Sequence, residues 1–416
     1  MNVSVKRTEF YGKTLAVPSK SSAHRLLIAA ALSQGKTTVK NVGGSDDVFA
    51  TASCLNALGA RIEIKGDDAV ICGIEEVKKG GVLDAGESGS TLRFLLPVAA
   101  ALGAECTFTG RGRLFLRPNR SLLDAMNARG AASDGKEVKG RLSCGLFSID
   151  ATVSSQYISG LLFALPLLDG DSRIELQGDA VSKDYVKMTL EVLDLAGIVV
   201  KKTENGFFVP GGQKYRMPDV ARCDGDWSSA AFMLVAGAVG KEVTVKGLRQ
   251  NSLQGDKKIV DILRQTGAEV TFFGDEVTVK KGGETPFEAD IGEVPDLAPI
   301  LAVLAATLRG ESRFRNVQRL RVKESDRLAA ICDMLTVGGI EHKIDGDDLI
   351  VRGGTPRGGD FNGYADHRMV MASVIFAGTC EEDSTVSCTE AVKKSYPSFF
   401  EDCKKIGGDF HVGMEG

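Results

Sequence analysis

The feature that most constrains the fold of this 416-residue chain is an internal repeat. Six times, a segment with helical character ends at a glycine, and most copies then run into a segment that alternates polar and apolar residues. The intervals between these glycines are 71, 67, 70, 72 and 68 residues. Each glycine is expected to stop its helix in the left-handed conformation. The glycines are Gly59, Gly130, Gly197, Gly267, Gly339 and Gly407.

Three of the repeats continue into a predicted hairpin. Their sequences are EIKGDDAVICG, TFFGDEVTVKKGG and HKIDGDDLIVRGG, and each places Gly-Asp between two alternating segments, which favours a tight turn. Each repeat holds strands and two helices, and is too long for a solenoid repeat of about 20–50 residues. The pattern therefore predicts an α/β protein with two domains of three repeats each, built in layers.

Composition excludes several classes of function. The 43% hydrophobic and 25% charged residues are typical of a globular protein. A net charge of −4 argues against general binding to nucleic acid or membrane surfaces. No apolar run reaches the roughly 18 residues of a membrane span, and the first twenty residues lack an apolar targeting core and contain Glu9. Nine cysteines without metal-ligand spacing suit reduced thiols in a cytoplasm, and with only four histidines we expect no metal site.

The stretch RVKESDR, from Arg321 to Arg327, mixes cations, carboxylates and a hydroxyl just before the apolar run LAAICDML. We expect the following helix to begin at Glu324 or Ser325, which places Lys323, Glu324 and Arg327 around its first turn. Cations are unfavourable at a helix N-terminus unless an anion is held between them. The alternative is a solvated run of charges with pairs three or four residues apart.

Basic residues recur at the starts of other expected helices. Capping explains the serines and aspartates found there, but it does not explain the cations, which the helix dipole disfavours. Several such N-termini brought together would bind a molecule with many negative charges. The basic residues are Lys20, Arg25, Arg93, Arg327, Arg368 and Lys394.

These segments also carry a family resemblance. In order along the chain, from Lys20 to Phe400, stand SKSSAHR, GESGSTLR, LRPNRSL, SSQYISGLL, SKDY, VPDLAP, RVKESDR, YADHRM and KKSYPSFF. Together they resemble the 5-enolpyruvylshikimate-3-phosphate (EPSP) synthases. The resemblance implies a two-domain inside-out α/β barrel with three repeats in each domain. It places residues 1–18 and 225–416 in a carboxy-terminal domain and residues 19–224 in an amino-terminal domain, with crossovers near Pro18 and Asp224.

The implied reaction transfers the enolpyruvyl group of phosphoenolpyruvate to the 5-hydroxyl of shikimate 3-phosphate and releases phosphate. It proceeds by addition and elimination through a tetrahedral intermediate, in a monomer without a cofactor. The chemistry needs a base, an acid and cations, and two carboxylates can divide the proton transfers. Asp296 and Glu324 match the family's proton acceptor and donor, although Asp296 could be a helix cap and Glu324 a partner of Arg327. Lys20 is a third candidate, because a lysine beside other cations has a lowered pKa.

Substrate contacts follow from the resemblance position by position. Arginine suits such a site because its planar fork binds phosphate and carboxylate bidentately, and Gly89 allows close approach of backbone to a ligand. Arg93 is expected to orient its loop. The residues that match the shikimate 3-phosphate site are Lys20, Ser21, Arg25, Ser154, Ser155, Gln156, Ser182, Tyr185, Asp296 and Lys323. Those that match the site for phosphoenolpyruvate and its competitor glyphosate are Lys20, Gly89, Arg117, Gln156, Arg327, Arg368 and Lys394.

The sequence departs from the family pattern in three places, and two alternatives stay open. VPSKS replaces the usual PGSKS, Glu87 replaces an asparagine, and Arg319 stands where another asparagine often contacts shikimate 3-phosphate. One alternative is a UDP-N-acetylglucosamine enolpyruvyl transferase, which shares the fold and the donor. That enzyme usually carries a cysteine in the loop that corresponds to residues 110–118, where this chain has none. The other is a non-catalytic anion-binding repeat protein, which would need neither Asp296 nor Glu324.

Overall fold

The computed structural model describes residues 1–413, and the chain divides into two compact units. The continuous unit is Pro18–Cys223, and the discontinuous unit combines Met1–Val17 with the segment that begins at Asp224. Each unit contains three four-stranded sheets. The structure thus has the six repeated units that the glycine spacing predicts.

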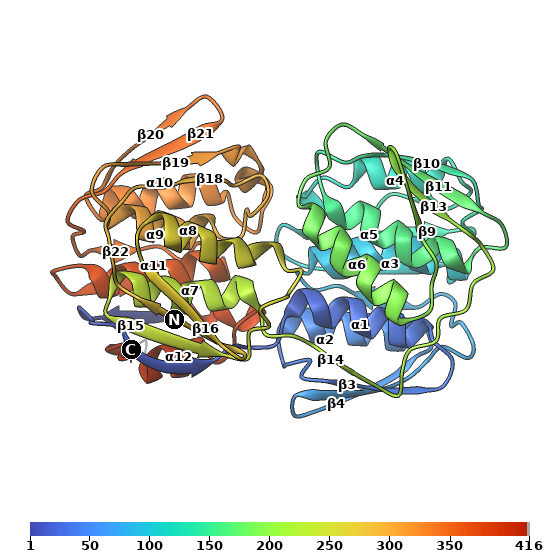
Figure 1. Cartoon of the computed structure of the whole chain (residues 1–416). Coiled ribbons are helices and arrows are strands. Elements are labelled where there is room, and N and C mark those ends of the chain that lie inside the picture. The colour runs from blue at the N-terminus through green and yellow to red at the C-terminus, as the bar shows by residue number, and fades with distance from the viewer. Residues whose placement is uncertain (414–416) are drawn as a thin grey trace. The chain divides into compact units, whose positions relative to one another are not determined.

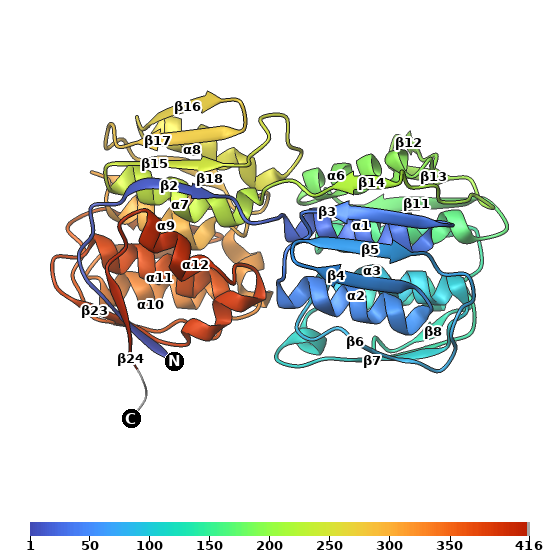
Figure 2. The same cartoon turned by 90° about the horizontal axis from the view of Figure 1, so that it is seen from below.

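All three sheets of the continuous unit have the same topology (Figure 1, Figure 2). The first two strands in the order given below are parallel, and the remaining neighbours are antiparallel. The sheets are β14 (Val220–Arg222), β3 (Lys36–Lys40), β5 (Asp68–Cys72) and β4 (Arg61–Lys65); β6 (Val82–Asp84), β7 (Cys106–Thr109), β9 (Glu137–Lys139) and β8 (Ala132–Ser133); and β10 (Leu146–Asp150), β11 (Ser172–Gln177), β13 (Gly206–Val209) and β12 (Lys201–Thr203).

The three sheets of the discontinuous unit have this same topology. Two of them include a strand from the amino terminus of the chain, β1 in one sheet and β2 in another. β1 pairs with β23 and β24, and β2 runs parallel to β15, so the start of the chain completes sheets formed by its end (Figure 2). The sheets are β22 (Asp360–Phe361), β23 (Ser384–Val386), β1 (Asn2–Val5) and β24 (Phe410–Gly413); β2 (Tyr11–Leu15), β15 (Glu242–Lys246), β17 (Glu276–Lys280) and β16 (Glu269–Phe273); and β18 (Glu288–Asp290), β19 (Glu311–Arg315), β21 (Asp348–Arg352) and β20 (Glu341–Asp345).

Each repeat contains two helical segments between its strands. The first is apolar nearly all round and lies inside its unit, whereas many second helices keep a polar face. The inner helices are α1 (Lys20–Leu32), α3 (Gly89–Leu102), α5 (Ser155–Ala164), α7 (Trp227–Val239), α9 (Ala298–Ala306) and α11 (His367–Thr379). The second helices are α2 (Asp46–Leu58), α4 (Arg120–Asn127), α6 (Lys183–Leu195), α8 (Ile259–Gln265), α10 (Arg327–Val337) and α12 (Phe399–Lys405). Short 3-10 helices are η1 (Leu114–Leu116), η2 (Leu165–Leu167), η3 (Gly255–Lys258), η4 (Val317–Val322) and η5 (Thr389–Lys394).

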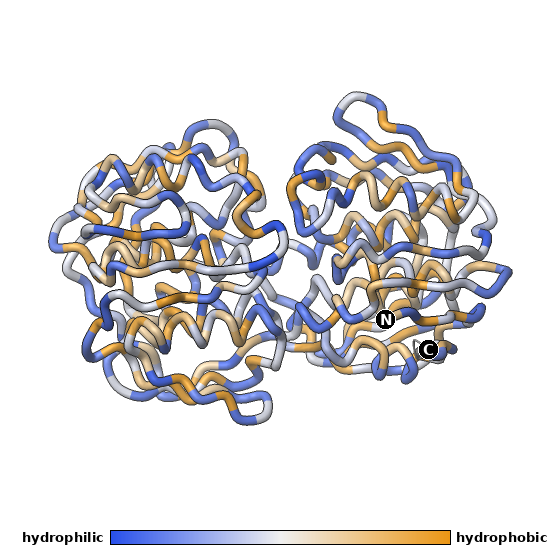
Figure 3. The backbone as a smooth tube through the Cα atoms, turned by 180° about the vertical axis from the view of Figure 1, so that it is seen from behind, coloured by the Kyte–Doolittle hydropathy of each residue, from blue (hydrophilic) through white to orange (hydrophobic). Residues whose placement is uncertain are grey.

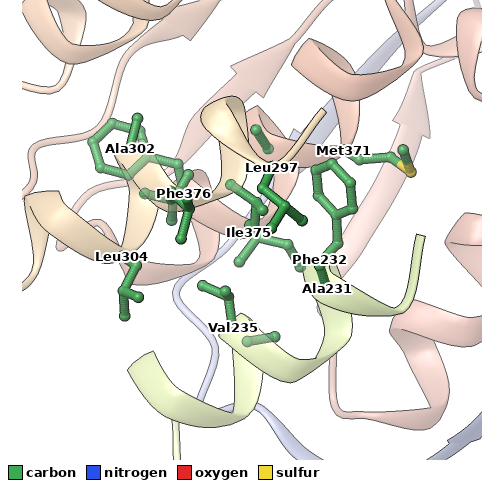
Figure 4. Packing of buried hydrophobic residues seen from close by; sticks show 14 of the residues in the cluster. Ala231, Phe232, Val235, Leu297, Ala302, Leu304, Met371, Ile375 and Phe376 are labelled. Carbon is green, nitrogen blue, oxygen red and sulfur yellow. The ribbon is translucent and has the colours of Figure 1, made fainter. Parts of the chain in front are cut away.

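The core of each unit lies between the inner helices and the sheets. Strands such as β5 alternate buried and partly exposed residues, so one face of a sheet packs on helices and the other meets solvent. Figure 3 shows the same division, with apolar segments along the inner helices and polar segments at the outer turns. In the discontinuous unit, Phe232 of α7, Leu304 of α9 and Ile375 of α11 belong to one buried cluster (Figure 4). Helices inside and sheets outside form the inside-out α/β architecture that was expected.

The predicted helix stops and hairpins are confirmed. All six repeat glycines have positive φ, from 69° at Gly339 to 119° at Gly59. A Cβ atom at Gly59 would lie 2.2 Å from the carbonyl oxygen of Glu76, so no larger residue fits there without movement of the backbone. The three Gly-Asp turns join β4 to β5, β16 to β17 and β20 to β21 as antiparallel pairs.

Several predicted helix starts were wrong. The helix after RVKESDR begins at Arg327, and its N-cap is Asp326, whose side chain accepts the N–H of Ala329 at 3.1 Å. Lys323 and Glu324 therefore precede the helix, because a 3-10 helix and an extended residue come first. Lys394 ends η5 and lies well before α12. Lys20 is the first residue of α1, as predicted, whereas Arg25 lies in the second turn of that helix.

Asp296 is not a helix cap. The N-cap of α9 is Leu297, and the Asp296 side chain is bound by cations instead. Among residues 1–413, no helix is long and apolar enough to cross a membrane.

Candidate active site

In the discontinuous unit, the guanidinium of Arg327 contacts three carboxylates. Its side chain is 1% exposed. Arg327 donates from Nη1 to Asp296 at 2.7 Å, from Nη2 to Glu324 at 2.7 Å, and from Nε to Asp366 at 2.8 Å. A buried guanidinium with three anionic partners is held in one orientation. The two carboxylates that the sequence singled out therefore bind the same cation.

Asp296 is surrounded by cations. Besides Arg327, it accepts a hydrogen bond from Nη2 of Arg368 at 3.1 Å, and Nζ of Lys323 lies 3.5 Å from it. Burial alone would raise the pKa of Asp296, but Arg368, Lys323 and Arg327 together hold that pKa well below its usual range. Burial also lowers the pKa of Lys323, to about 8, and Arg327 and Arg319 act in the same direction.

Two further cations complete this cluster. Nζ of Lys394 lies 3.9 Å from the carboxylate of Glu324. Arg368 is 4% exposed, and its Nε and Nη1 atoms are buried with no hydrogen-bond partner among the described residues. Leaving buried donors unsatisfied is costly, so this guanidinium is suited to receive an anion.

In the continuous unit, Arg93 lies inside α3 and not in a loop, and it holds three neighbouring groups by hydrogen bonds. It donates from Nη1 to Oε1 of Gln156 at 2.6 Å, from Nη2 to the Pro118 carbonyl at 3.0 Å and from Nε to Asn119 at 2.8 Å. Gln156 in turn donates to Ser90 at 2.9 Å. One guanidinium thereby joins the starts of α3 and α5 to the segment that follows η1.

Gly89, the first residue of α3, lies close to this arrangement. A Cβ atom at Gly89 would lie 2.9 Å from Nη1 of Arg117 and 3.6 Å from Nη1 of Arg93. The helix N-terminus contributes backbone N–H groups and partial positive charge. Gly89, Arg117 and Gln156, all predicted for the same ligand, are thus brought together.

Arg25 links two other helix starts. It is 2% exposed and donates to the backbone carbonyls of Ser21 at 2.7 Å and Tyr185 at 2.9 Å, and to Oγ1 of Thr189 at 2.8 Å. Ser182 is the N-cap residue of α6, and the side chain of Ser154 caps α5 by accepting the N–H of Gln156. The first turns of α1 and α6 are therefore held side by side.

Lys20 lies in the first turn of α1, and its Nζ is 2.8 Å from Asp47. Asp47, Asp366 and Asp256 are buried carboxylates that the sequence analysis did not assign to a site. The second, Asp366, could have been noticed as the residue before His367 at the start of α11. The third, Asp256, accepts a hydrogen bond from Ser228, and burial raises its pKa to about 6.

Glu87 and Arg319, which depart from the family pattern, have contacts within their own units. A Cβ atom at Gly112 would lie 2.6 Å from Oε1 of Glu87, so the Glu87 carboxylate is close to Gly112. Arg319 donates to the Gly292 carbonyl at 2.7 Å. Within residues 1–413, no group of three or more His, Cys, Asp or Glu side chains is arranged to hold a metal ion.

Solved structures show which fold this is. An EPSP synthase from Acinetobacter baumannii superimposes with a TM-score of 0.82 at 24% identity, over 99% of this chain and 100% of that one. The enolpyruvyl transferase NikO from Streptomyces tendae gives a TM-score of 0.81 at 18% identity, over 99% and 98% of the two chains. The fold is the one that these enolpyruvyl transferases share.

Sequence comparison identifies the family. The family model for EPSP synthase (3-phosphoshikimate 1-carboxyvinyltransferase) matches residues 6–403. A 3-phosphoshikimate 1-carboxyvinyltransferase of Clostridium kluyveri is 40% identical over 417 residues, covering 98% of this chain and 97% of that protein. A protein of the same name from Brachyspira hyodysenteriae is 38% identical, with coverage of 98% and 99%. The chain belongs to the EPSP synthase family.

Proposed function

We propose that this chain transfers the enolpyruvyl group of phosphoenolpyruvate to the 5-hydroxyl of shikimate 3-phosphate and releases phosphate. Family membership over residues 6–403 supports the choice of reaction. The observation that carries it is the pair of carboxylates on Arg327: Asp296 and Glu324 each lie 2.7 Å from that guanidinium. An addition–elimination reaction between two anions needs such a pair for protons and the surrounding cations for charge.

Asp296 is proposed as the proton acceptor and Glu324 as the proton donor. While Asp296 is bound by Arg327 and Arg368, its low pKa makes it a weak base. An incoming anion that takes over these cations would raise the pKa of Asp296 and strengthen it as a base. Lys20, in the continuous unit, is a third candidate for proton transfer.

Substrate contacts are proposed for each unit separately. The shikimate 3-phosphate contacts of the continuous unit are Lys20, Ser21, Arg25, Ser154, Ser155, Gln156, Ser182 and Tyr185, and those of the discontinuous unit are Asp296 and Lys323. The phosphoenolpyruvate contacts of the continuous unit are Lys20, Gly89, Arg117 and Gln156, and those of the discontinuous unit are Arg327, Arg368 and Lys394. The cations among them suit the phosphate and carboxylate groups of both substrates.

We also propose that the two compact units are the two domains of the enzyme, with crossovers near Pro18 and Asp224. The enzyme is proposed to act as a monomer in the cytoplasm, on small-molecule substrates alone. Gel filtration with light scattering tests whether the protein is a monomer. The measured molar mass of a monomer would be the 44.2 kDa of the chain, and that of a dimer would be twice this value.

A turnover assay tests the function. The purified protein is incubated with phosphoenolpyruvate and shikimate 3-phosphate, and released phosphate is measured together with the enolpyruvyl product by mass spectrometry. Phosphate release with UDP-N-acetylglucosamine in place of shikimate 3-phosphate would identify the sibling activity instead. Binding of phosphoenolpyruvate without turnover of either acceptor would favour a non-catalytic anion-binding protein.

A further inference from the structure

Asp366 is the N-cap of α11 and is 0% exposed. One of its oxygens, Oδ1, accepts the backbone N–H of Arg368 at 3.0 Å. The other, Oδ2, accepts Nε of Arg327 at 2.8 Å and the hydroxyl of Ser325 at 3.0 Å. A second contact from Arg327, Nη2 to Oδ1 at 3.3 Å, makes the pair bidentate. One buried carboxylate thereby binds both arginines that hold Asp296.

Asp366 holds the two arginines that contact Asp296 in different ways. Arg327 is fixed through its side chain, because the bidentate pair with Asp366 leaves its Nη1 directed at Asp296. Arg368 is fixed through its backbone, because Asp366 caps the helix turn from which its side chain extends. A displacement of the Asp366 side chain would therefore move both Arg327 and Arg368 relative to the proposed base, Asp296.

The backbone before Asp366 is strained, and neighbouring contacts hold it in place. Tyr364 and Ala365 have φ of 54° and 49°, a conformation that is unfavourable for residues other than glycine. Such conformations persist where surrounding contacts over-determine them, and they cluster at functional sites. Here Asp366 N–H donates to the Gly363 carbonyl at 2.9 Å, and the Tyr364 hydroxyl donates to Asp333 of α10 at 2.9 Å.

We propose that Asp366 is a positioning residue for the reaction, which sets Arg327 and Arg368 at the spacing needed to bind the anionic donor and to release Asp296 as the base. This inference rests on the proposed function. Because Asp366 is fully buried, it acts through the two arginines and does not touch substrate. Its negative charge also offsets the charge of Arg327 before any ligand binds.

The test compares two matched N-cap substitutions, Asp366→Asn and Asp326→Asn. Asparagine is a good N-cap residue, so both variants keep an acceptor for the helix and lose one charge. Asp326 caps the neighbouring helix α10, and among residues 1–413 its ion pair is with Arg321, at 3.4 Å. We expect Asp366→Asn to raise KM for phosphoenolpyruvate about 10-fold and to lower kcat about 10- to 100-fold, with KM for shikimate 3-phosphate changed less than about 3-fold. Asp326→Asn should change each constant less than about 2-fold.

A double-mutant cycle with Arg327→Gln separates positioning from general damage to the fold. If Asp366 acts through Arg327, Asp366→Asn should cost much less in the Arg327→Gln background than in the wild type. Calorimetric titration with phosphoenolpyruvate gives a second readout that does not depend on turnover. If the wild type binds phosphoenolpyruvate but transfers nothing, the proposed function fails, while the binding comparison still tests the role of Asp366.

Three results would overturn the proposal. They are equal losses for both substrates in Asp366→Asn, the same loss in Asp326→Asn, and fully additive effects in the double mutant. If Asp366→Asn does not fold, Asp366→Ser takes its place, because serine also caps a helix and carries no charge. The same pattern of KM and kcat is then required of Asp366→Ser.

Discussion

Replacing Asp296 by asparagine should have two opposite effects. The change keeps the size of the side chain but removes the proposed base, so turnover should fall by roughly 10²–10⁴, the usual scale for a positioned acid or base. At the same time, binding of a small anion should become tighter. In the structure, the Asp296 carboxylate accepts hydrogen bonds from Arg327 and Arg368 and lies beside Lys323. An incoming phosphate has to compete with it.

The gain in binding can be bounded from the contacts. Asp296 takes two charge-assisted hydrogen bonds, at 2.7 and 3.1 Å, and an ion pair at 3.5 Å. Hydrogen bonds to charged groups contribute about 1.5–3 kcal/mol each. The side chain is 24% exposed, and an asparagine still accepts a hydrogen bond. We therefore expect a net gain of about 1–2 kcal/mol, or roughly 5- to 30-fold tighter binding.

The assay is isothermal titration of the free protein with inorganic phosphate, and then with phosphoenolpyruvate, at fixed ionic strength. Asp348→Asn is the matched control: it removes one negative charge from the same unit, at 21% exposure, but its partner is Arg313. The control should bind phosphate like the wild type. Weaker phosphate binding by Asp296→Asn would refute the view that Asp296 competes with the donor, and near-normal turnover would refute its role as the base.

Four further predictions follow from the same geometry. Glu324→Gln removes the proposed acid and should lower turnover by roughly 10²–10⁴; wild-type rates of phosphate release would exclude that role. Arg368→Ala should weaken phosphoenolpyruvate far more than shikimate 3-phosphate in steady-state kinetics, whereas equal losses would indicate a role in folding. Gly89→Ala should weaken inhibition by glyphosate, because the new methyl group meets Nη1 of Arg117 at 2.9 Å; an unchanged inhibition constant would place the inhibitor elsewhere. Lys323 is protonated below its pKa of about 8, so binding of shikimate 3-phosphate should weaken as pH rises through that value. In Lys323→Arg, the affinity for shikimate 3-phosphate should stay constant in measurements between about pH 6 and 9.5, because arginine stays charged. If the affinity of this variant still falls with pH, another group is responsible for the fall.

What the sequence determined by itself is local or periodic. The left-handed glycines, the Gly-Asp hairpins and the apolar inner helices depend on residues within a few positions of one another. Their recurrence at intervals of 67 to 72 residues was enough to predict six repeats. The motifs that place the chain in its family are likewise short runs of sequence. Because the candidate site residues lie in these short motifs, the sequence was enough to select them, although it did not give their geometry.

What only the tertiary structure decided is which of these residues meet. Asp366 reaches Arg327 across 39 positions, and Arg368 reaches Asp296 across 72. No local pattern encodes such a pairing, because it depends on how α9, α10 and α11 pack around a shared core. The helix start at Arg327 was missed for a related reason: Glu324 and Ser325 were plausible first residues by propensity. Instead, Glu324 accepts a hydrogen bond from Arg327, and Ser325 donates one to Asp366. Asp326 is therefore the residue whose side chain caps the helix.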